Sequence, residues 1–369
     1  MPVDLGSQRD PSGQRRYANW RRTPLLLLLA ALLLLIGYGA TVAPPINSDP
    51  PPTTSAPAHQ PANDDLRLYA NIAARMANGE KYYTAAVAEH RFNTYPLKPF
   101  FAVRLPTLAT VTAWLSPPLM RFLAFVLLCA TCVAWWQRLE GAFDDQGRRF
   151  IAVLLIINGS DALLRSKHLN LHEIWAAGFI ALSAAIYRTT NPFPAIIAAG
   201  VALLIRETAL PFLCLMAAAA VWERRWKELA GWTAAVTLFA VAMALHYTAM
   251  ADVVTPDDHS SPGWVRTNGL VSYLMFTHQA SALRALPLAA AAVVVPLALL
   301  GWSSWKSRLG TIITLFHLGY AVLFMIIGRP NNFYWGFLVT PTLLVGLAFL
   351  PATAKEFYHI LRSNRRTQQ

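Results

Sequence analysis

Ten apolar runs divide this chain into a regular alternation of hydrophobic stretches and polar connections. The first run holds about 20 residues, the length of one helical crossing of a bilayer. The pattern therefore predicts an all-α fold, a polytopic membrane helix bundle of about ten spans. The runs cover roughly residues 23–42, 119–136, 150–164, 172–187, 193–206, 208–222, 229–250, 285–302, 309–327 and 334–350.

Four consecutive runs between 150 and 222 are short for a crossing, at about 14–16 residues each. The stretch 193–222 has two interpretations, one long tilted helix or a hairpin whose tip is Arg206-Glu207. Arg188 and the charged cluster at 223–227 flank it. Both flanks are expected in the cytoplasm, and only a hairpin satisfies that requirement. The same argument predicts a second hairpin over 150–187, with its tip at 165–173.

Two polar connections are long enough to form exported loops. The first, 43–106, begins with a Pro-rich tether and changes after Asn63 to a helical pattern that ends at Asn78-Gly79. The second, about 251–284, is polar at first and amphipathic from Leu270 to Leu283. The remaining units are a basic N-terminus (1–22), a first span (23–42), a multi-span membrane domain (107–350) and a basic tail (351–369).

Composition and charge support this organisation. Apolar residues make up 55% of 369 positions and charged residues only 14%, which excludes a soluble domain. The net charge of +12 comes from basic clusters at the same end of alternate runs, so both termini are expected in the cytoplasm and no nucleic-acid partner is expected. Pro44-Pro45 and the length of the first run favour a retained anchor over a cleaved signal peptide.

The first exported loop carries an adjacent carboxylate pair, Asp64 and Asp65. In a helix, Asp65 shares a face with Tyr69 and the apolar positions that follow, whereas Asp64 faces the other way. Asp64 is explained well as a first-turn acid that stabilises the helix dipole. A carboxylate that points along an apolar stripe near basic groups is instead a candidate for acid–base or metal-assisted chemistry.

A metal site is a weaker possibility. His172 and Glu173 would be the partners of Asp65 in such a site, but no ligand spacing requires one. A structural role for the histidine is the better interpretation. No cofactor is required by the sequence, and a divalent cation stays open.

Several short motifs resemble the GT-C superfamily of integral-membrane glycosyltransferases, which use polyprenyl-phosphate-linked sugars. They are degenerate but span essentially the whole chain: Asp65-x-x-x-Tyr69, Ala-Arg-x-x-x-Gly79-x-x-Tyr82-Tyr83, Tyr95-Pro-Leu-Lys-Pro-Phe100, Arg104-Leu-Pro106, Arg206-Glu207-Thr208 and Gly328-Arg329-Pro330. The resemblance implies that a first-loop aspartate is catalytic. This chain has Asp-Asp where many members have Asp-Glu or a single Asp, so Asp64 stays an alternative to Asp65. No large C-terminal exported domain follows, so the loops themselves would hold the acceptor.

The implied reaction is an inverting displacement with Asp65 as general base. The lipid phosphate that leaves requires cations, and the candidates are Arg206, Arg165, Lys167, Arg329 and His168. Each also has a structural interpretation: Arg206 can pair with Glu207, and Arg165 or Lys167 can reach lipid headgroups. The expected substrate contacts are Tyr69, Tyr82, Tyr83 and Glu207. Aromatic residues such as Tyr82, Tyr83, Trp264 and Tyr334 would stack on sugar or anchor the membrane interface.

The expected partners are a lipid-linked sugar donor, a glycan, lipid or protein acceptor, and membrane lipids. The expected location is the cytoplasmic (inner) membrane of a cell envelope, with the active site on the exported face. A multi-span transporter or lipid flippase is the main alternative, because charges inside the membrane suit transport equally well. The repeated halves typical of transporters are not visible in the sequence. A non-catalytic membrane subunit would not need the buried charges.

Overall fold

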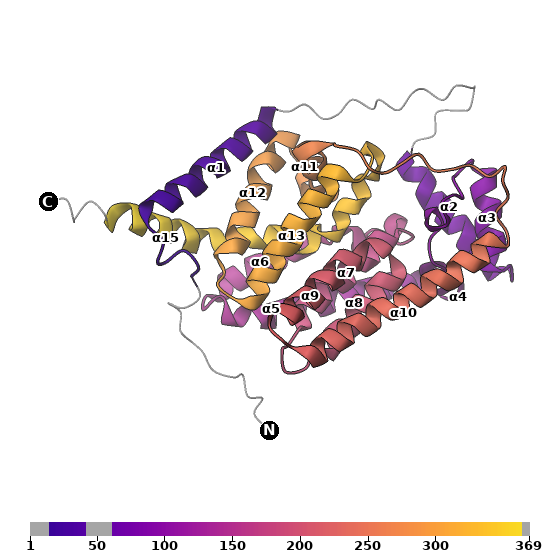
Figure 1. Ribbon diagram of the computed structural model, residues 1–369, viewed down its shortest axis with the longest axis horizontal. Coiled ribbons are helices and arrows are strands. Elements are labelled where there is room, and N and C mark those ends of the chain that lie inside the picture. The colour runs from indigo at the N-terminus through magenta and orange to yellow at the C-terminus, as the bar shows by residue number, and fades with distance from the viewer. Residues whose placement is uncertain (1–14, 42–60, 364–369) are drawn as a thin grey trace.

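The computed structural model describes residues 15–41 and 61–363, except for the side chains of 61–64 and 363, and every regular element in these ranges is a helix (Figure 1). The α-helices are α1 (Arg22–Thr41), α2 (Pro61–Ala77), α3 (Tyr82–Phe92), α4 (Thr107–Trp114), α5 (Pro117–Arg138), α6 (Gln146–Gly159), α7 (His172–Ile186), α8 (Phe193–Ile205), α9 (Leu210–Trp222), α10 (Trp226–Ala251), α11 (Gly269–Gln279), α12 (Leu288–Ser304), α13 (Arg308–Ile326), α14 (Thr340–Leu343) and α15 (Leu350–Ser363).

Short 3-10 helices connect many of these elements. They are η1 (Phe100–Ala102), η2 (Leu139–Gly141), η3 (Asp161–Leu164), η4 (Ser166–His168), η5 (Glu207–Ala209), η6 (Ala282–Ala285), η7 (Pro330–Leu338) and η8 (Leu344–Phe349). Each of the ten predicted apolar runs overlaps a helical element, so the all-α prediction is confirmed for the described part of the chain.

Within the described residues, four helices are long and apolar enough to cross a membrane: α1, α5 together with η2, α10 and α13. A fifth crossing is formed if η7 and the helical segment 340–362 count as one span, bent by 54°. The other apolar helices are shorter than a full crossing, among them α7, α8, α9 and α12. The number of ten spans therefore stays a prediction.

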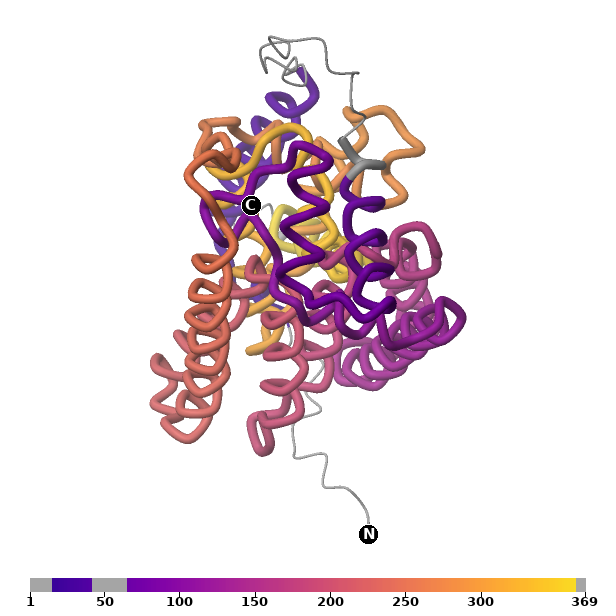
Figure 2. The backbone as a smooth tube through the Cα atoms, turned by 90° about the vertical axis from the view of Figure 1, so that its right-hand side faces the viewer, coloured from indigo at the N-terminus to yellow at the C-terminus, as the bar shows by residue number. Residues whose placement is uncertain are grey.

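The stretch 193–222 forms a hairpin, as predicted. The guanidinium of Arg225, just after α9, donates a hydrogen bond to the carbonyl oxygen of Thr189, just before α8. One straight helix would separate these two residues, 36 positions apart, by about 54 Å. α8 and α9 therefore run in opposite directions, and Figure 2 looks onto the side of the molecule where α2 and α3 lie.

The tightest packing surrounds 330–349, which lies in the middle of the bundle. A Cβ on Gly301 in α12 would lie 1.8 Å from the carbonyl oxygen of Gly346, and one on Gly159 would lie 2.0 Å from that of Thr340. Backbones in such close contact leave no room for a side chain. Trp335, together with nearly all side chains of α14 and η8, is buried there.

The helix α11 lies within the second predicted exported loop, but it does not have the expected amphipathic surface. All seven side chains from Val271 to Thr277 are buried, Tyr273 and Phe276 among them. The aromatic rings of α11 pack against Phe324 of α13, with centroids 6.3 and 5.3 Å away. The Thr277 hydroxyl is satisfied locally, because it donates to the Tyr273 carbonyl oxygen at 2.9 Å, whereas the Tyr273 hydroxyl is buried without a hydrogen-bond partner in the described part of the chain.

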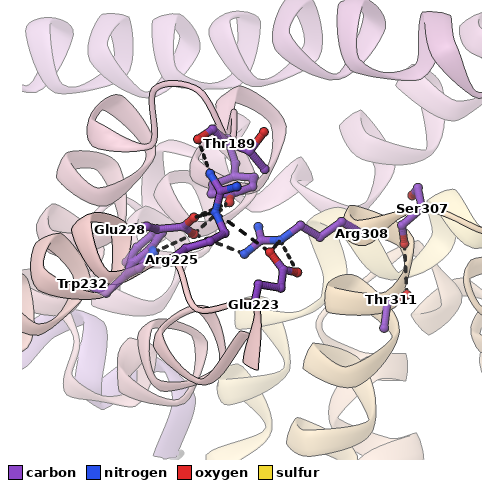
Figure 3. A network of polar contacts seen from close by, with 9 residues as sticks. Thr189, Glu223, Arg225, Glu228, Trp232, Ser307, Arg308 and Thr311 are labelled. Carbon is purple, nitrogen blue, oxygen red and sulfur yellow. Dashed lines mark hydrogen bonds and ion pairs between the residues drawn. The ribbon is translucent and has the colours of Figure 1, made fainter. Parts of the chain in front are cut away.

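A charged network fastens one end of the bundle (Figure 3). The Glu228 carboxylate, only 2% exposed, lies at the start of α10 and accepts from Tyr187 Oη at 2.8 and 2.9 Å. It also accepts from Arg225 Nε at 2.6 Å, Trp232 Nε1 at 3.2 Å and Arg308 Nη2 at 3.3 Å. We call this set the Glu228 network. It joins the ends of α7, α9, α10 and α13.

The other partners of Arg308 complete this network. Its Nε donates to both oxygens of Glu223, at 2.7 and 2.8 Å, and its guanidinium lies over the Tyr187 ring, 4.6 Å from the centroid. Three turns that are far apart in the sequence are thereby held together.

Candidate active site

The helix α2 positions Asp65 at the other end of the bundle from the Glu228 network. Its apolar face, with Leu68 and Ile72 each 2% exposed, packs on a small core that includes Val87 and Met250. The helix ends as predicted, because Gly79 takes φ +93° and donates its amide to Met76 at 2.9 Å. This packing turns the Asp65 face toward the bundle. The side chain of Asp64 lies outside the described residues.

Asp65 is partly buried and lies among tyrosines. Its carboxylate is hydrogen-bonded by the hydroxyls of Tyr95 and Tyr334. Burial raises the pKa of Asp65 above its ordinary value, while the two tyrosines and the nearby Arg104 guanidinium oppose that rise. A carboxyl group with a raised pKa is better matched to proton transfer near neutral pH than an exposed one.

A second group of charges is centred on the start of α7 and the turn between α8 and α9, and we call it the Arg206 network. Arg206 is 1% exposed, and its Nε lies 2.6 Å from Glu173 Oε1 in the first turn of α7. Its Nη1 pairs with Glu207, which also pairs with Arg104 Nη1 at 3.0 Å. Arg206 Nη2 is buried with no hydrogen-bond partner. The local pair with Glu207 is therefore present, but Arg206 also neutralises a fully buried glutamate.

Tyr69 connects Asp65 to this network. It follows Asp65 by one helical turn, and its ring packs edge-on against His172, with centroids 4.7 Å apart. Burial raises the pKa of Tyr69, and the carboxylates of Asp65 and Glu173 add to the rise, whereas Arg104 lowers it. Asp65 and the Arg206 network therefore form one electrostatic cluster. With Asp65 ionised, its three carboxylates exceed its two guanidinium groups by one negative charge.

Tyr82 and Tyr83 both hold the segment that carries Arg104. Tyr82 Oη donates to the Arg104 carbonyl oxygen at 2.6 Å. Tyr83 Oη lies 3.1 Å from His246 Nδ1, and His246 Nε2 lies 3.1 Å from the carbonyl oxygen of Val103. The rings of Tyr82 and Tyr83 meet edge to face, with their centroids 5.1 Å apart. Of the two, only Tyr82 also lines the small pocket beside Tyr69.

Three of the predicted phosphate ligands lie around Asp161. Arg165 Nη2 lies 2.8 Å from Asp161 Oδ2, and Arg284 pairs with the same carboxylate. Lys167 is exposed. Burial, together with the nearby cations Lys167 and Arg165, lowers the pKa of His168 to about 4. His168 is therefore neutral near pH 7 and lacks the positive charge that a phosphate ligand would need.

Arg329 lies beside Trp264, its Cζ 6.0 Å from the ring centroid. Its Nε is buried without a hydrogen-bond partner. The structure thus places Arg206 and Glu207 near Asp65, and Arg165, Lys167 and His168 around Asp161. Arg329 is connected to the Asp65 group through its backbone amide, which donates to Asn332 Oδ1 at 3.0 Å, while Asn332 Nδ2 donates to the Tyr334 hydroxyl at 3.1 Å.

The hypothetical metal site at Asp65, His172 and Glu173 does not form. Within 15–41 and 61–363 there is no group of three or more His, Cys, Asp or Glu side chains that could hold a metal ion. Glu173 is committed to Arg206 instead.

The two predicted exported loops are fastened to each other over this end. Arg91 of α3 makes a bidentate pair with Asp258, both contacts at 2.8 Å, which holds the pKa of Asp258 well below its ordinary value. The Lys98 ammonium donates a hydrogen bond to the Pro256 carbonyl oxygen at 2.8 Å, and the Leu97 amide donates one to the His259 carbonyl oxygen at 3.0 Å. The helix that carries Asp65 is thereby tied to the connection between α10 and α11.

Sequence reasoning missed three members of the cluster. The short motifs include Arg104 and Tyr95, and Tyr334 is a possible stacking residue. The sequence predicts no contact of these residues with Asp65 or Glu207. The only sequence signal for Arg104 was a single arginine directly before a short apolar helix in an exported segment. No protein-family model, curated protein or solved structure matches this chain, so the geometry alone carries the functional argument.

Proposed function

We propose that this protein is an integral-membrane glycosyltransferase that moves a sugar from a polyprenyl-phosphate donor to an acceptor on the exported face. The carrying observation is Asp65: a carboxylate with a raised pKa, held by two tyrosine hydroxyls beside a buried arginine network. Structural carboxylates in membrane proteins are usually paired with a cation. Asp65 is held by tyrosines, and such a group is a candidate for proton transfer.

The membrane placement rests on charge and helix direction. α1, α5, α10 and α13 are apolar enough to cross a bilayer, and basic residues collect around the Glu228 network, at the turns after α7, α9 and α12. The positive-inside rule then assigns that end and both termini to the cytoplasm. Asp65, at the other end, faces the exported side of a cytoplasmic membrane.

In the proposed reaction, the acceptor hydroxyl oxygen attacks the anomeric carbon of the lipid-linked sugar. The new carbon–oxygen bond forms while the bond from that carbon to the phosphate oxygen breaks, and its electron pair leaves with the lipid phosphate. The hydroxyl proton passes to the Asp65 carboxylate. Tyr95 and Tyr334 hold the carboxylate in place, and Arg104 stabilises its ionised form.

The choice of phosphate ligands depends on which cations remain accessible to the lipid-linked donor. Arg206 is already compensated by two carboxylates, so its proposed role is to set the local field. Arg165 and Lys167 are exposed at the same end of the bundle and are the better candidates for a lipid phosphate.

The direct test replaces each aspartate separately. Asp65→Asn keeps the shape of the side chain but removes the base, so transfer should fall by at least about 100-fold, the usual scale for loss of a general base. Asp64→Asn is the matched control in the same helical turn and should retain most activity. Transfer is measured with purified protein and a panel of polyprenyl-phosphate sugars. Normal transfer by Asp65→Asn would refute the proposal.

Transport of a lipid-linked substrate is the competing function. Reconstituted protein separates the two, because a flippase moves labelled lipid-linked sugar across the bilayer without breaking the phosphate–sugar bond. Asp65→Asn should abolish bond cleavage and leave any such movement unchanged.

A further inference from the structure

A narrow pocket lies one helical turn along α2 from Asp65, between α2, α3, α4 and the start of α7. Its walls are Tyr69 and Ile72 of α2, Tyr82 of α3, Leu108, Ala109 and Thr112 of α4, and Asn170 and His172. Its enclosed space is small, on the order of one water molecule, so it fits a single small polar group. No Asp, Glu, Lys or Arg side chain lines it.

Two of the lining residues each have a buried side-chain atom without a hydrogen-bond partner: Oγ1 of Thr112 and Nδ1 of His172. His172 is 2% exposed, so its unpartnered nitrogen has no access to bulk water. Buried polar atoms in native proteins are nearly always hydrogen-bonded, which makes such a pair in one pocket informative. A hydroxyl can both donate and accept, as can the Asn170 amide on the same wall. The group that best satisfies this set is another hydroxyl.

The aromatic walls are held rigidly. Tyr82 Oη is committed to the Arg104 carbonyl oxygen at 2.6 Å, and the Tyr69 ring packs against His172. The positions of both rings are therefore fixed by these contacts. Fixed aromatic surface beside a few polar atoms that accept or donate is the usual composition of a small-ligand site.

Charge around the pocket selects against an anion. Asp65, Glu173 and Glu207 outnumber Arg104 and Arg206 by one charge when Asp65 is ionised, and neither arginine lines the pocket. A carboxylate or phosphate placed there would be desolvated with no cation to contact, which costs several kcal/mol for typical ions.

We propose that this pocket takes a hydroxyl or hydroxymethyl group of an uncharged sugar ring, and that it selects neutral sugars over uronic acids and sugar phosphates at this position. The inference rests on the proposed function and specifies its substrate class. The anionic part of the donor, its lipid phosphate, would lie outside this pocket. Thr112 and His172 are the residues that would determine the specificity.

The test measures binding of defined probes to the purified full chain. A panel of neutral methyl hexosides and pentosides is compared with methyl glucuronide and glucose 6-phosphate, using thermal shift and saturation-transfer NMR. At least one neutral glycoside should bind more tightly than both charged probes. Thr112→Val, which removes only the hydroxyl, should weaken that binding by about tenfold, the effect of losing one hydrogen bond.

The control is Thr110→Val, the same change on the same helix at a position outside the pocket lining. It should leave binding unchanged. The inference is overturned if a charged probe binds best, if no neutral glycoside binds, or if Thr112→Val binds like the unaltered protein. Asp65→Asn separates this result from the proposed function, because it should lose transfer and still bind the neutral probe. A variant that binds and transfers normally would instead refute Asp65 as base and leave the pocket assignment standing.

Discussion

Two buried charge networks lie at opposite ends of α7 and differ in how fully their polar atoms are satisfied. The Glu228 carboxylate accepts hydrogen bonds from four side chains, and Arg308 Nη1 in the same network is buried without a partner among the described residues. At the other end, Arg206 Nη2 has no partner, nor does His172 Nδ1 beside it, and burial raises the pKa of Asp65. The ends of α7 are separated by about 20 Å, so the two networks are independent.

This difference indicates which network holds the fold together and which one could act on a ligand. A carboxylate with every lone pair satisfied fixes the turns around it and has no capacity left for a ligand. A network with several unpartnered atoms is less stable than a fully hydrogen-bonded one. Such sites are commonly where a substrate completes the hydrogen bonding. We therefore regard the Glu228 network as a clamp and the Asp65 cluster as the reactive end.

Arg206→Gln is expected to cause the largest loss of stability. The change leaves Glu173, 2% exposed, without its cation, and removal of one partner from a buried pair typically costs about 3–5 kcal/mol. Glu207→Gln should cost less, because Glu207 is 28% exposed and Arg206 keeps Glu173. Thermal unfolding in detergent compares both variants and the double variant. Equal losses of stability in the two single variants would mean that the role of Arg206 is only to pair with Glu207.

Glu228→Gln should lower stability without changing the chemistry. An amide keeps the shape and some hydrogen bonds but loses charge-assisted ones, a cost of about 1–3 kcal/mol. The protein that remains folded should transfer sugar at the normal rate. Activity per folded molecule is the measurement, with Asp65→Asn as the opposite case. A turnover defect that exceeds the loss of folded protein would contradict the role of a clamp.

The pH dependence of Asp65 follows from the direction of its shift. A folded-state pKa raised above the unfolded value means that the fold favours the protonated form. Its stabilising contribution is complete below the unfolded pKa, about 4, and is lost as pH rises through the folded pKa. Asp65→Asn should therefore gain stability relative to the unaltered protein as pH rises over this window. Transfer should rise over the same window, because the base must be ionised. A stability difference that does not vary with pH would contradict the raised pKa.

Arg165→Gln should have the smallest effect on folding. Its pair with Asp161 is 42% exposed on the arginine side, and exposed pairs contribute about 0.2–1 kcal/mol. Because Arg284 also holds Asp161, the loop should stay folded. A rise in the apparent KM for lipid-linked donor with near-normal stability would support a phosphate role. A stability loss as large as that of Arg206→Gln would show that the group around Asp161 is structural.

The sequence predicted what periodicity and charge determine. The apolar runs, the hairpin over 193–222, the end of α2 at Gly79 and the inward face of Asp65 all follow from local pattern. Contacts between distant segments were not predictable from that pattern. Tyr334 reaches the cluster because η7 packs against α7, and Arg104 reaches it because its segment lies against the turn between α8 and α9, where Arg104 pairs with Glu207. The hydropathy of α11 likewise did not reveal that α13 would bury it.

The position of 330–349 has a consequence for biogenesis. This segment follows α5 to α13 along the chain, yet it fills the middle of the bundle they form, with backbone-to-backbone contacts at Gly301 and Gly159. A ribosome therefore delivers the surrounding helices before the piece that packs between them. We therefore expect the earlier helices to pack loosely until 330–349 joins them, so that final compaction follows translation. Chains arrested before 330 should be captured by membrane chaperones and degraded.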